Sequence, residues 1–314
     1  MSFIVFFTGG EVTIFFYLHN AKLNIRHNYK AFMIIFKHGG KLEDFGLRKK
    51  NKNNSIGFVP TMGALHEGHL SLIRECKKVS KITVASIFVN PTQFNNKEDL
   101  KKYPRPVSKD ILLLEENGCD ILFLPDEKEI YPNDESKKKS YRLGNLESIM
   151  EGEFRPGHFQ GVCLVVEKLL NIINPDFLFL GQKDYQQCLV IKKLISLMHQ
   201  KTRVIICPIF RETNGLAMSS RNERLNPSER ENASELYRSL NFIKENLSGD
   251  NFLILRKQVL SRLQEKGFKV EYLELAKRKN LKIVTNPNGG EELIILIAAF
   301  LSNVRLIDNL LINP

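Results

Sequence analysis

The chain has 314 residues, 43% of them hydrophobic and 26% charged, which is the composition of a globular protein large enough for two domains. Its formal net charge of +11 favours an anionic partner such as nucleic acid, an acidic surface or a phosphorylated small molecule. The basic residues are scattered and not interleaved with aromatic ones, and no run of about 18 apolar residues occurs, so we expect neither a nucleic-acid footprint nor a membrane span.

The cysteine pattern indicates the redox environment. The five cysteines include no Cys-x-x-Cys pair; they are Cys76, Cys119, Cys163, Cys188 and Cys207. An odd number without close spacing predicts buried, reduced thiols rather than a disulfide framework or a structural zinc site. We therefore expect a cytoplasmic protein.

Residues 1–32 differ from the rest of the chain. They are rich in aromatic residues and are interrupted by Gly9, Gly10 and Glu11. No basic region precedes the apolar part and no small-residue cleavage site follows it, which argues against a secretory signal. We expect an N-terminal extension outside the fold, with the folded part beginning at Met33.

From Met33 to residue 210, apolar runs alternate with helical patterns. The expected strands are 56–61, 82–90, 121–125, 176–181 and 203–208, and the expected helices are 70–79, 111–118, 159–175 and 182–199. Repeated strand–helix–strand units predict an α/β fold, namely a Rossmann-like open parallel sheet with helices on both faces.

After residue 210 the pattern changes. Helices are expected at 226–247 and 252–265, the first opening with a cap and acidic residues, and short strands at 270–275 and 292–300. This arrangement predicts a smaller C-terminal α+β domain over residues 211–314.

The segment PTMGALHEGHL (60–70) places His66 and His69 three residues apart where a strand gives way to a helix. A metal site is disfavoured, because the spacing lacks the i, i+4 geometry of His-Glu-x-x-His and no third ligand cluster is evident. The histidines could instead satisfy an ordinary turn. We favour phosphate binding, because Gly63 and Gly68 allow close approach to the backbone and a helix N-terminus offers amide donors there.

Four further motifs narrow the interpretation. They are SIFVNPTQF (86–94), FRPGHFQGV (154–162), LGQKDYQQ (180–187) and GLAMSSRN (215–222). With PTMGALHEGH, in this order and spacing, residues 33–314 resemble the pantoate–β-alanine ligase family of the HxGH nucleotidyltransferase-like enzymes. The resemblance implies two steps: ATP adenylates the carboxylate of pantoate with release of pyrophosphate, and the amine of β-alanine then displaces AMP to give pantothenate. It also implies ATP as co-substrate, Mg²⁺ and a homodimer. On this basis 33–210 would be the ATP- and pantoate-binding domain and 211–314 a lid.

The resemblance further implies roles for individual residues, carried over by position. The catalytic residues would be His66, His69, Lys183 and Arg221, with His69 as proton donor. The ATP-binding residues would be Met62, Gly63, Ala64, Leu65, His66, Glu67, Gly68, His69, Gly181, Gln182, Lys183, Asp184, Phe210, Met218, Ser219, Ser220 and Arg221. Gln93 and Gln187 would bind pantoate or β-alanine, and Arg155 and His158 would line the pocket. Gln182 stands where the family more often has an acid.

Two other functions fit parts of the sequence. A generic adenylyltransferase acting on a phosphorylated acceptor would explain HEGH and MSSRN but gives NPTQF and DYQQ no purpose. A nucleic-acid-binding protein would fit the net charge, but the last hundred residues lack interleaved aromatic and basic side chains. We therefore expect small-molecule substrates, with no nucleic acid or membrane as partner.

Overall fold

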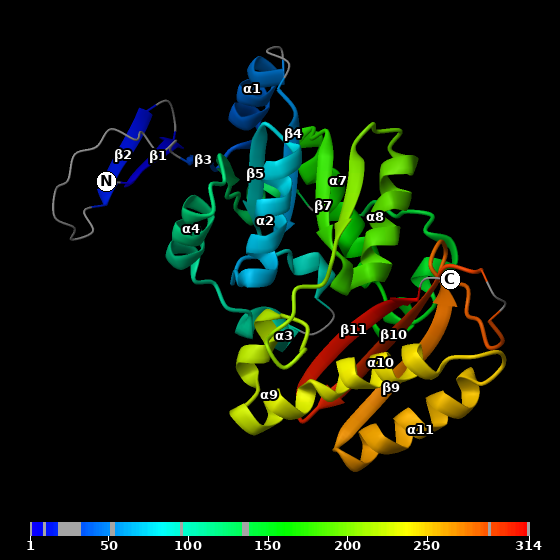
Figure 1. Ribbon diagram of the computed structural model, residues 1–314. Coiled ribbons are helices and arrows are strands. Elements are labelled where there is room, and N and C mark those ends of the chain that lie inside the picture. Colours follow the sequence, from blue (N-terminus) through cyan, green and yellow to red (C-terminus); the bar gives the residue numbers. More distant parts are fainter. Residues whose placement is uncertain are drawn as a thin grey trace.

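The computed structural model describes residues 2–8, 11–17, 33–50, 54–94, 97–133, 138–287 and 290–312. Of the segment 1–32, the described parts are strands β1 (Ser2–Thr8) and β2 (Glu11–Tyr17). β2 pairs antiparallel with β1, which in turn runs parallel to β3 (Ile34–Phe36) at the edge of the main sheet (Figure 1). The domain boundaries at residues 32 and 210 stay predictions.

The main sheet is parallel from β1 to β8. Its order is β2-β1-β3-β6-β5-β4-β7-β8. The remaining strands are β4 (Ile56–Thr61), β5 (Ile82–Ile87), β6 (Ile121–Phe123), β7 (Phe177–Gly181) and β8 (Arg203–Cys207). A strand occurs at each place where the sequence predicted one in this half of the chain, and the predicted fold class is confirmed.

Helices cover both faces of this sheet. One layer contains α1 (Gly39–Lys50), α7 (His158–Ile173) and α8 (Tyr185–Leu197), and the other contains α2 (Glu67–Val79) and α4 (Val107–Glu116). Successive strand residues serve opposite layers: Phe58 packs in the first hydrophobic cluster and Val59 in the second. Burial on both faces explains why the strands are continuously apolar. The short helices α3 (Lys97–Lys102), α5 (Glu127–Ile130) and α6 (Glu151–Phe154) lie in the connections.

The C-terminal part is a three-stranded antiparallel sheet with three helices. The strands β9 (Phe268–Lys277), β10 (Leu293–Leu301) and β11 (Val304–Ile312) have the order β11-β10-β9. One face packs on α10 (Glu235–Asn246) and α11 (Phe252–Glu265), and the other packs on α8 and the residues before α6. The small sheet therefore lies between its own helices and the parallel-sheet part (Figure 1).

Two expectations for this part need correction. The helix predicted at 226–247 is two helices, α9 (Pro227–Ala233) and α10, which meet at Ser234. Ser234 is fully buried and its hydroxyl donates to the Glu231 carbonyl at 2.6 Å. The third strand, β11, was not predicted.

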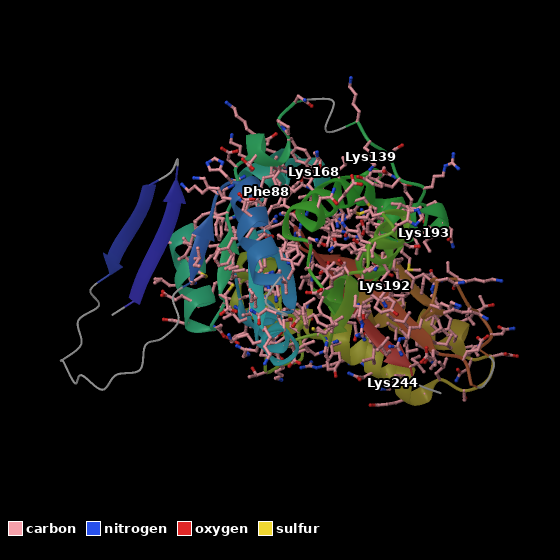
Figure 2. The ribbon with its side chains drawn as sticks, turned by 90° about the horizontal axis from the view of Figure 1, so that it is seen from above. Phe88, Lys139, Lys168, Lys192, Lys193 and Lys244 are labelled. Carbon is pink, nitrogen blue, oxygen red and sulfur yellow. The ribbon has the colours of Figure 1, made fainter. Side chains whose placement is uncertain are left out.

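The outer surface carries spread positive charge. Lys192 and Lys193 on α8 are exposed, and so is Lys244 on α10, in the other part of the molecule (Figure 2). Within the described part of the chain, no helix is long and apolar enough to span a bilayer. All five cysteines are buried free thiols.

The close contact of α7 with the loop after β5 generates a stability prediction. A Cβ on Gly161 would lie 2.2 Å from the Thr92 carbonyl oxygen and 2.8 Å from the Gln93 nitrogen. Gly161→Ala should therefore push the 3₁₀ turn Pro91–Gln93 off the helix and lower the free energy of unfolding by about 1–3 kcal/mol. Urea denaturation followed by circular dichroism measures this change.

The matched control is Gly40→Ala on α1, because a Cβ there would meet nothing within 4 Å. We expect it to be neutral or stabilising by up to about 1 kcal/mol. Equal unfolding midpoints for Gly161→Ala and Gly40→Ala would contradict the packing explanation.

Candidate active site

His66 and His69 cap the N-terminus of α2. His66 Nδ1 accepts a hydrogen bond from the Gly68 amide at 3.1 Å, and His69 Nδ1 accepts one from the His66 amide at 3.4 Å. Together they form a capping box built from imidazoles. Because each Nδ1 acts as an acceptor, each neutral ring carries its proton on Nε2. Two Nε2–H donors therefore remain for a ligand.

Burial keeps both imidazoles neutral at pH 7. Desolvation, reinforced by the nearby Lys183 charge, lowers the pKa of His66 to about 4. Desolvation, together with His66 and Lys183, lowers the pKa of His69 to about 3. In the ligand-free protein the pair consequently offers neutral hydrogen-bond donors rather than cations.

Asp110, on α4, holds the loop between β4 and α2. This loop has positive φ at Gly63 (80°) and Ala64 (50°). The Asp110 carboxylate accepts hydrogen bonds from the amides of Ala64 and Leu65, both at 2.8 Å, and Asp110 is 1% exposed. These bonds satisfy two buried amides that the turn leaves without partners. Sequence reasoning missed Asp110, because no motif marks it and it lies about 45 residues from its partners.

A cavity of about 250 Å³ lies at the carboxyl ends of the parallel strands. It is bounded by segments that follow β4, β5, β7 and β8. Of the residues predicted from the sequence, those lining it are Met62, His66, Gly68, His69, Gln93, Arg155, His158, Gly181, Lys183, Asp184, Gln187, Phe210, Met218, Ser219, Ser220 and Arg221. The fold thus brings all five sequence motifs to one place.

The other predicted residues do not line this cavity. Gly63, Ala64 and Leu65 form the loop that Asp110 holds. The carboxylate of Glu67 pairs with Arg74 at 2.9 Å and is exposed. Gln182 directs its amide to Asn309 of β11 at 3.0 Å.

Amide groups occupy the side of the cavity next to β5. Asn90, 1% exposed, donates from Nδ2 to Gln93 Oε1 and to the Gly161 carbonyl, both at 3.1 Å. Its Oδ1 accepts from the Tyr131 hydroxyl at 2.9 Å. Asn90 therefore orients the Gln93 amide so that its nitrogen is turned away from Asn90, 2.9 Å from Met62 Sδ. Asn90 lies inside the NPTQF motif, but sequence reasoning passed over it.

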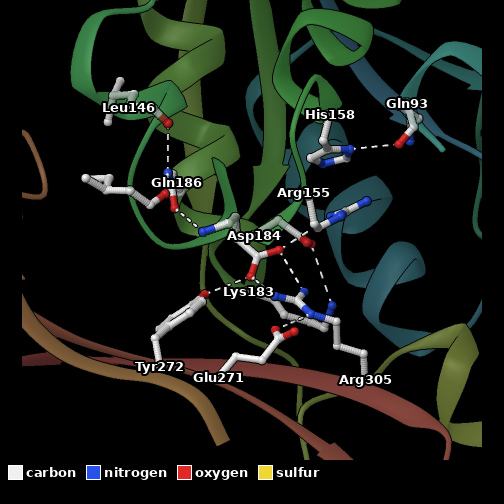
Figure 3. A network of polar contacts seen from close by, with 12 residues as sticks. Gln93, Leu146, Arg155, His158, Lys183, Asp184, Gln186, Glu271, Tyr272 and Arg305 are labelled. Atoms are coloured by element: carbon white, nitrogen blue, oxygen red, sulfur yellow. Dashed lines mark hydrogen bonds and ion pairs between the residues drawn. The ribbon is translucent and has the colours of Figure 1, made fainter. Parts of the chain in front are cut away.

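His158 uses the opposite tautomer from the histidine pair. Its Nδ1 donates to the Gln93 carbonyl at 2.9 Å, so its Nε2 is left as an acceptor (Figure 3). Burial and the Arg155 charge lower its pKa to about 4, which keeps this acceptor unprotonated at neutral pH.

A buried ionic network joins the cavity wall to the small sheet (Figure 3). The Glu151 carboxylate accepts hydrogen bonds from Arg305 at 2.7 and 2.9 Å and from the Tyr272 hydroxyl at 2.8 Å, and Arg155 lies 3.4 Å from it. Burial alone would raise the pKa of Glu151, but the hydrogen bonds and charge of Arg305 lower it to about 2. Arg305 also pairs with Glu271 at 2.7 Å.

The electrostatic character of the cavity follows from these groups. Lys183, Arg155 and Arg221 line it, whereas Asp184 is its one carboxylate among the described lining residues. Guanidinium and ammonium groups bind phosphates and carboxylates. The cavity is therefore suited to more than one anion, with neutral amides and imidazoles alongside the cations.

Comparison with known proteins identifies the family. The sequence profile described as pantoate-beta-alanine ligase matches residues 35–311. The chain belongs to the pantoate–β-alanine ligase family.

Individual relatives agree with this assignment. The chain is 46% identical over 267 residues to a pantothenate synthetase from Cytophaga hutchinsonii, covering 84% of this chain and 94% of that protein. It is 42% identical over 284 residues to a pantothenate synthetase from Caldicellulosiruptor bescii, covering 90% of this chain and 99% of that protein. The family and ligase function predicted from the motifs are confirmed.

Solved structures of the family share the fold. The crystal structure of pantothenate synthetase from Thermus thermophilus has a TM-score of 0.81 and 36% identity, covering 89% of this chain and 99% of that one. The crystal structure of pantoate–β-alanine ligase from Francisella tularensis, complexed with β-γ ATP and β-alanine, has a TM-score of 0.75 and 37% identity. The match covers 89% of this chain and 97% of that one.

The depressed pKa of His66 predicts a pH-dependent stability. Above its unfolded value of 6.5 the ring is neutral in both states, and as the pH falls toward 4 only the unfolded chain takes up the proton. This contribution to stability is therefore complete above pH 6.5 and is lost between pH 6.5 and 4. His66→Asn keeps a capping acceptor but does not titrate. Between pH 7 and 4.5, its Tm should fall by about 2–4 °C less than that of the wild type.

Thermal melts by circular dichroism across this pH range measure the difference. His199→Asn is the control, since His199 is exposed and has a positive φ of 54°, a conformation that asparagine adopts readily. The control should follow the wild-type curve. If His66→Asn followed it too, the capped imidazole would not be the titrating group.

Proposed function

We propose that this ligase joins pantoate to β-alanine inside the cavity described above, with ATP bound across the segments that follow β4, β7 and β8. The observation that carries the proposal is the convergence of neutral Nε2–H donors, cations and amides on one crevice. A carboxylate is a poor acylating agent, and coupling it to AMP creates a good leaving group. The protein must therefore hold two anions in contact, which needs placed donors rather than a nucleophilic side chain.

In the first step an oxygen of the pantoate carboxylate attacks the α-phosphorus of ATP, and pyrophosphate leaves. We assign Lys183 and Arg221 to the phosphates, where their charge offsets that of the leaving group. The Nε2–H groups of His66 and His69 donate hydrogen bonds to phosphate oxygens, and we assign His69 as the proton donor, a role for which its ring takes up a second proton once the negative triphosphate lies beside it. Their neutrality in the free protein allows them to stand side by side, with ring centroids 4.1 Å apart, without mutual repulsion.

In the second step the amine of β-alanine attacks the acyl carbon of pantoyl adenylate, AMP leaves with both electrons of the acyl–oxygen bond, and the nitrogen loses its extra proton to solvent. We assign Gln93 and Gln187 to the hydroxyls and carboxylate of pantoate. Neutral amides hold these groups without reducing the nucleophilicity of the carboxylate. Cys188 also lines the cavity, but burial raises the pKa of its thiol, so it stays protonated and takes no part.

We further propose that Mg²⁺ enters with ATP. Asp184 is the one carboxylate among the described lining residues, and this donor set suits a cation that keeps most of its water and binds phosphate oxygens. The metal supplies neutralisation of the triphosphate charge. Lys183 is next to Asp184 on the same turn, and its Nζ lies 3.8 Å from Asp184 Oδ2.

The test of the function is the release of AMP and pyrophosphate by purified protein with ATP and Mg²⁺, omitting each acceptor in turn. Pyrophosphate should appear with pantoate alone in a single turnover, and AMP release should need both pantoate and β-alanine. His69→Ala should slow pantoate-dependent pyrophosphate release by about 10²-fold or more. His199→Asn, which changes an exposed histidine outside the cavity, should leave the rate unchanged.

Each outcome of this assay separates one assignment from another. Wild-type rates from folded His69→Ala would remove His69 from the mechanism. If folded wild-type protein bound ATP but released no AMP with both acceptors, pantoate or β-alanine would be the wrong acceptor. The generic adenylyltransferase would then be tested with phosphorylated acceptors.

We also propose a cytoplasmic homodimer. The five buried free thiols support a reducing compartment, and the family resemblance supports the dimer. Light scattering of the purified protein at micromolar concentration should give twice the chain mass of 36.2 kDa. The mass of a single chain under these conditions would contradict the dimer.

A further inference from the structure

Asn309, on β11 of the small sheet, makes three hydrogen bonds to the turn that carries Lys183. Its Nδ2 donates to the carbonyls of Gln182 at 2.9 Å and Lys183 at 3.0 Å, and its Oδ1 accepts from Gln182 Nε2 at 3.0 Å. Asn309 is 1% exposed, so these bonds are shielded from water. A residue more than 120 positions away in the sequence therefore fixes the backbone of a phosphate-binding segment.

The turn needs such a partner. Gln182–Asp184 is a single turn of 3₁₀ helix between β7 and α8, and no side chain caps its N-terminus. The internal hydrogen bonds of so short a 3₁₀ helix have poor geometry, and each carbonyl oxygen can accept a second bond, so a buried partner from outside the turn strengthens it. The Asn309 amide supplies two donors in one plane and thereby fixes the direction in which the Lys183 side chain leaves the backbone.

The neighbouring residue, Asp308, holds another part of the site from the opposite face of β11. Its carboxylate accepts from Arg211 at 2.6 and 2.9 Å, and the Arg211 guanidinium stacks 3.7 Å above the Tyr237 ring. Arg211 follows Phe210 and forms a β-bridge with Ala217, next to Met218. Successive strand residues point to opposite faces, so two adjacent side chains can hold two separate segments.

We propose that Asn309 is a positioning residue for Lys183, and that Asp308 and Asn309 together hold the two ATP-binding segments in register with each other. The proposal rests on the phosphate-binding role proposed above for Lys183. It assigns to the small sheet a function in the adenylation step that requires no contact with the substrate. The hydrogen bonds of Asn309 act through the backbone of the turn.

The test is Asn309→Asp, which keeps the shape of the side chain but replaces two donors with an acceptor facing two carbonyls. Pantoate-dependent pyrophosphate release in a single turnover should slow by about tenfold or more, because the lysine is displaced from the phosphates. The reaction of presynthesised pantoyl adenylate with β-alanine does not involve those phosphates and should stay within about threefold of wild type. A merely structural defect would slow both half-reactions in parallel.

A double-mutant cycle with Lys183→Ala shows whether Asn309 acts through the lysine. If it does, Asn309→Asp should add less than about twofold to the loss already caused by Lys183→Ala. Fully multiplicative effects would overturn the proposal. The control is Asn232→Asp, since Asn232 likewise donates from Nδ2 to a carbonyl, that of Lys266 at 2.9 Å, but this hydrogen bond is exposed and Asn232 does not line the cavity.

Two additions keep the test decisive. If Asn309→Asp fails to fold, Asn309→Ala replaces it, because the smaller side chain leaves room for water at the two carbonyls. Calorimetric binding of ATP without pantoate, measured across the same cycle, separates this proposal from the identity of the acceptor. If Asn309→Asp weakens ATP binding, and its effect is not additive with that of Lys183→Ala, the role of Asn309 is supported even if pantoate is not the substrate. If Asn309→Asp changes neither the affinity for ATP nor the rate of pyrophosphate release, the proposal is overturned.

Discussion

The order of the parallel sheet reverses between β4 and β7, and the active site depends on this reversal. From β4 the chain proceeds to β5 and β6 on one side, and β7 and β8 lie on the other. The loops leaving β4 and β7 therefore diverge and leave a crevice at the carboxyl ends of the strands. Polar groups gather there because the adjoining strands are apolar and buried on both faces, so the loops at their ends carry the chemistry.

The crevice is completed by a second sheet that is attached through a hydrophobic cluster and through buried polar contacts. Glu151 with Arg305 and Gln182 with Asn309 join the two parts, alongside the hydrophobic cluster around Tyr272. Removing one member of a buried ion pair commonly costs about 3–5 kcal/mol, because the other charge stays buried and unpaired. These polar contacts require a stricter geometry than hydrophobic ones. A shift of the small sheet would therefore also move the cationic residues of the cavity wall.

The same contacts explain which parts of the fold and of the site could be predicted from the sequence. β4 and α2 were predicted because an apolar run is followed by helical spacing, and both signals are local. β11 was missed because Arg305, Asp308 and Asn309 interrupt its apolar pattern, and their partners lie 154, 97 and 127 positions away.

The residues that line the cavity come from motifs in continuous segments, so resemblance could name them. Asp110 and Asn309 have no such motif, because each binds the backbone of a functional segment through geometry that residue type and spacing do not encode.

The histidine pair shows how two interpretations of one motif can both hold. The turn interpretation and the phosphate interpretation use different nitrogens, because Nδ1 of each ring accepts an amide of the turn and Nε2 carries the proton. A metal at Nε2 would need that proton removed, and Nδ1 would then have to take one up and lose its capping bond. The helix cap therefore fixes the tautomer, and a ring that carries its proton on Nε2 is suited to donate to an anion rather than to bind a cation.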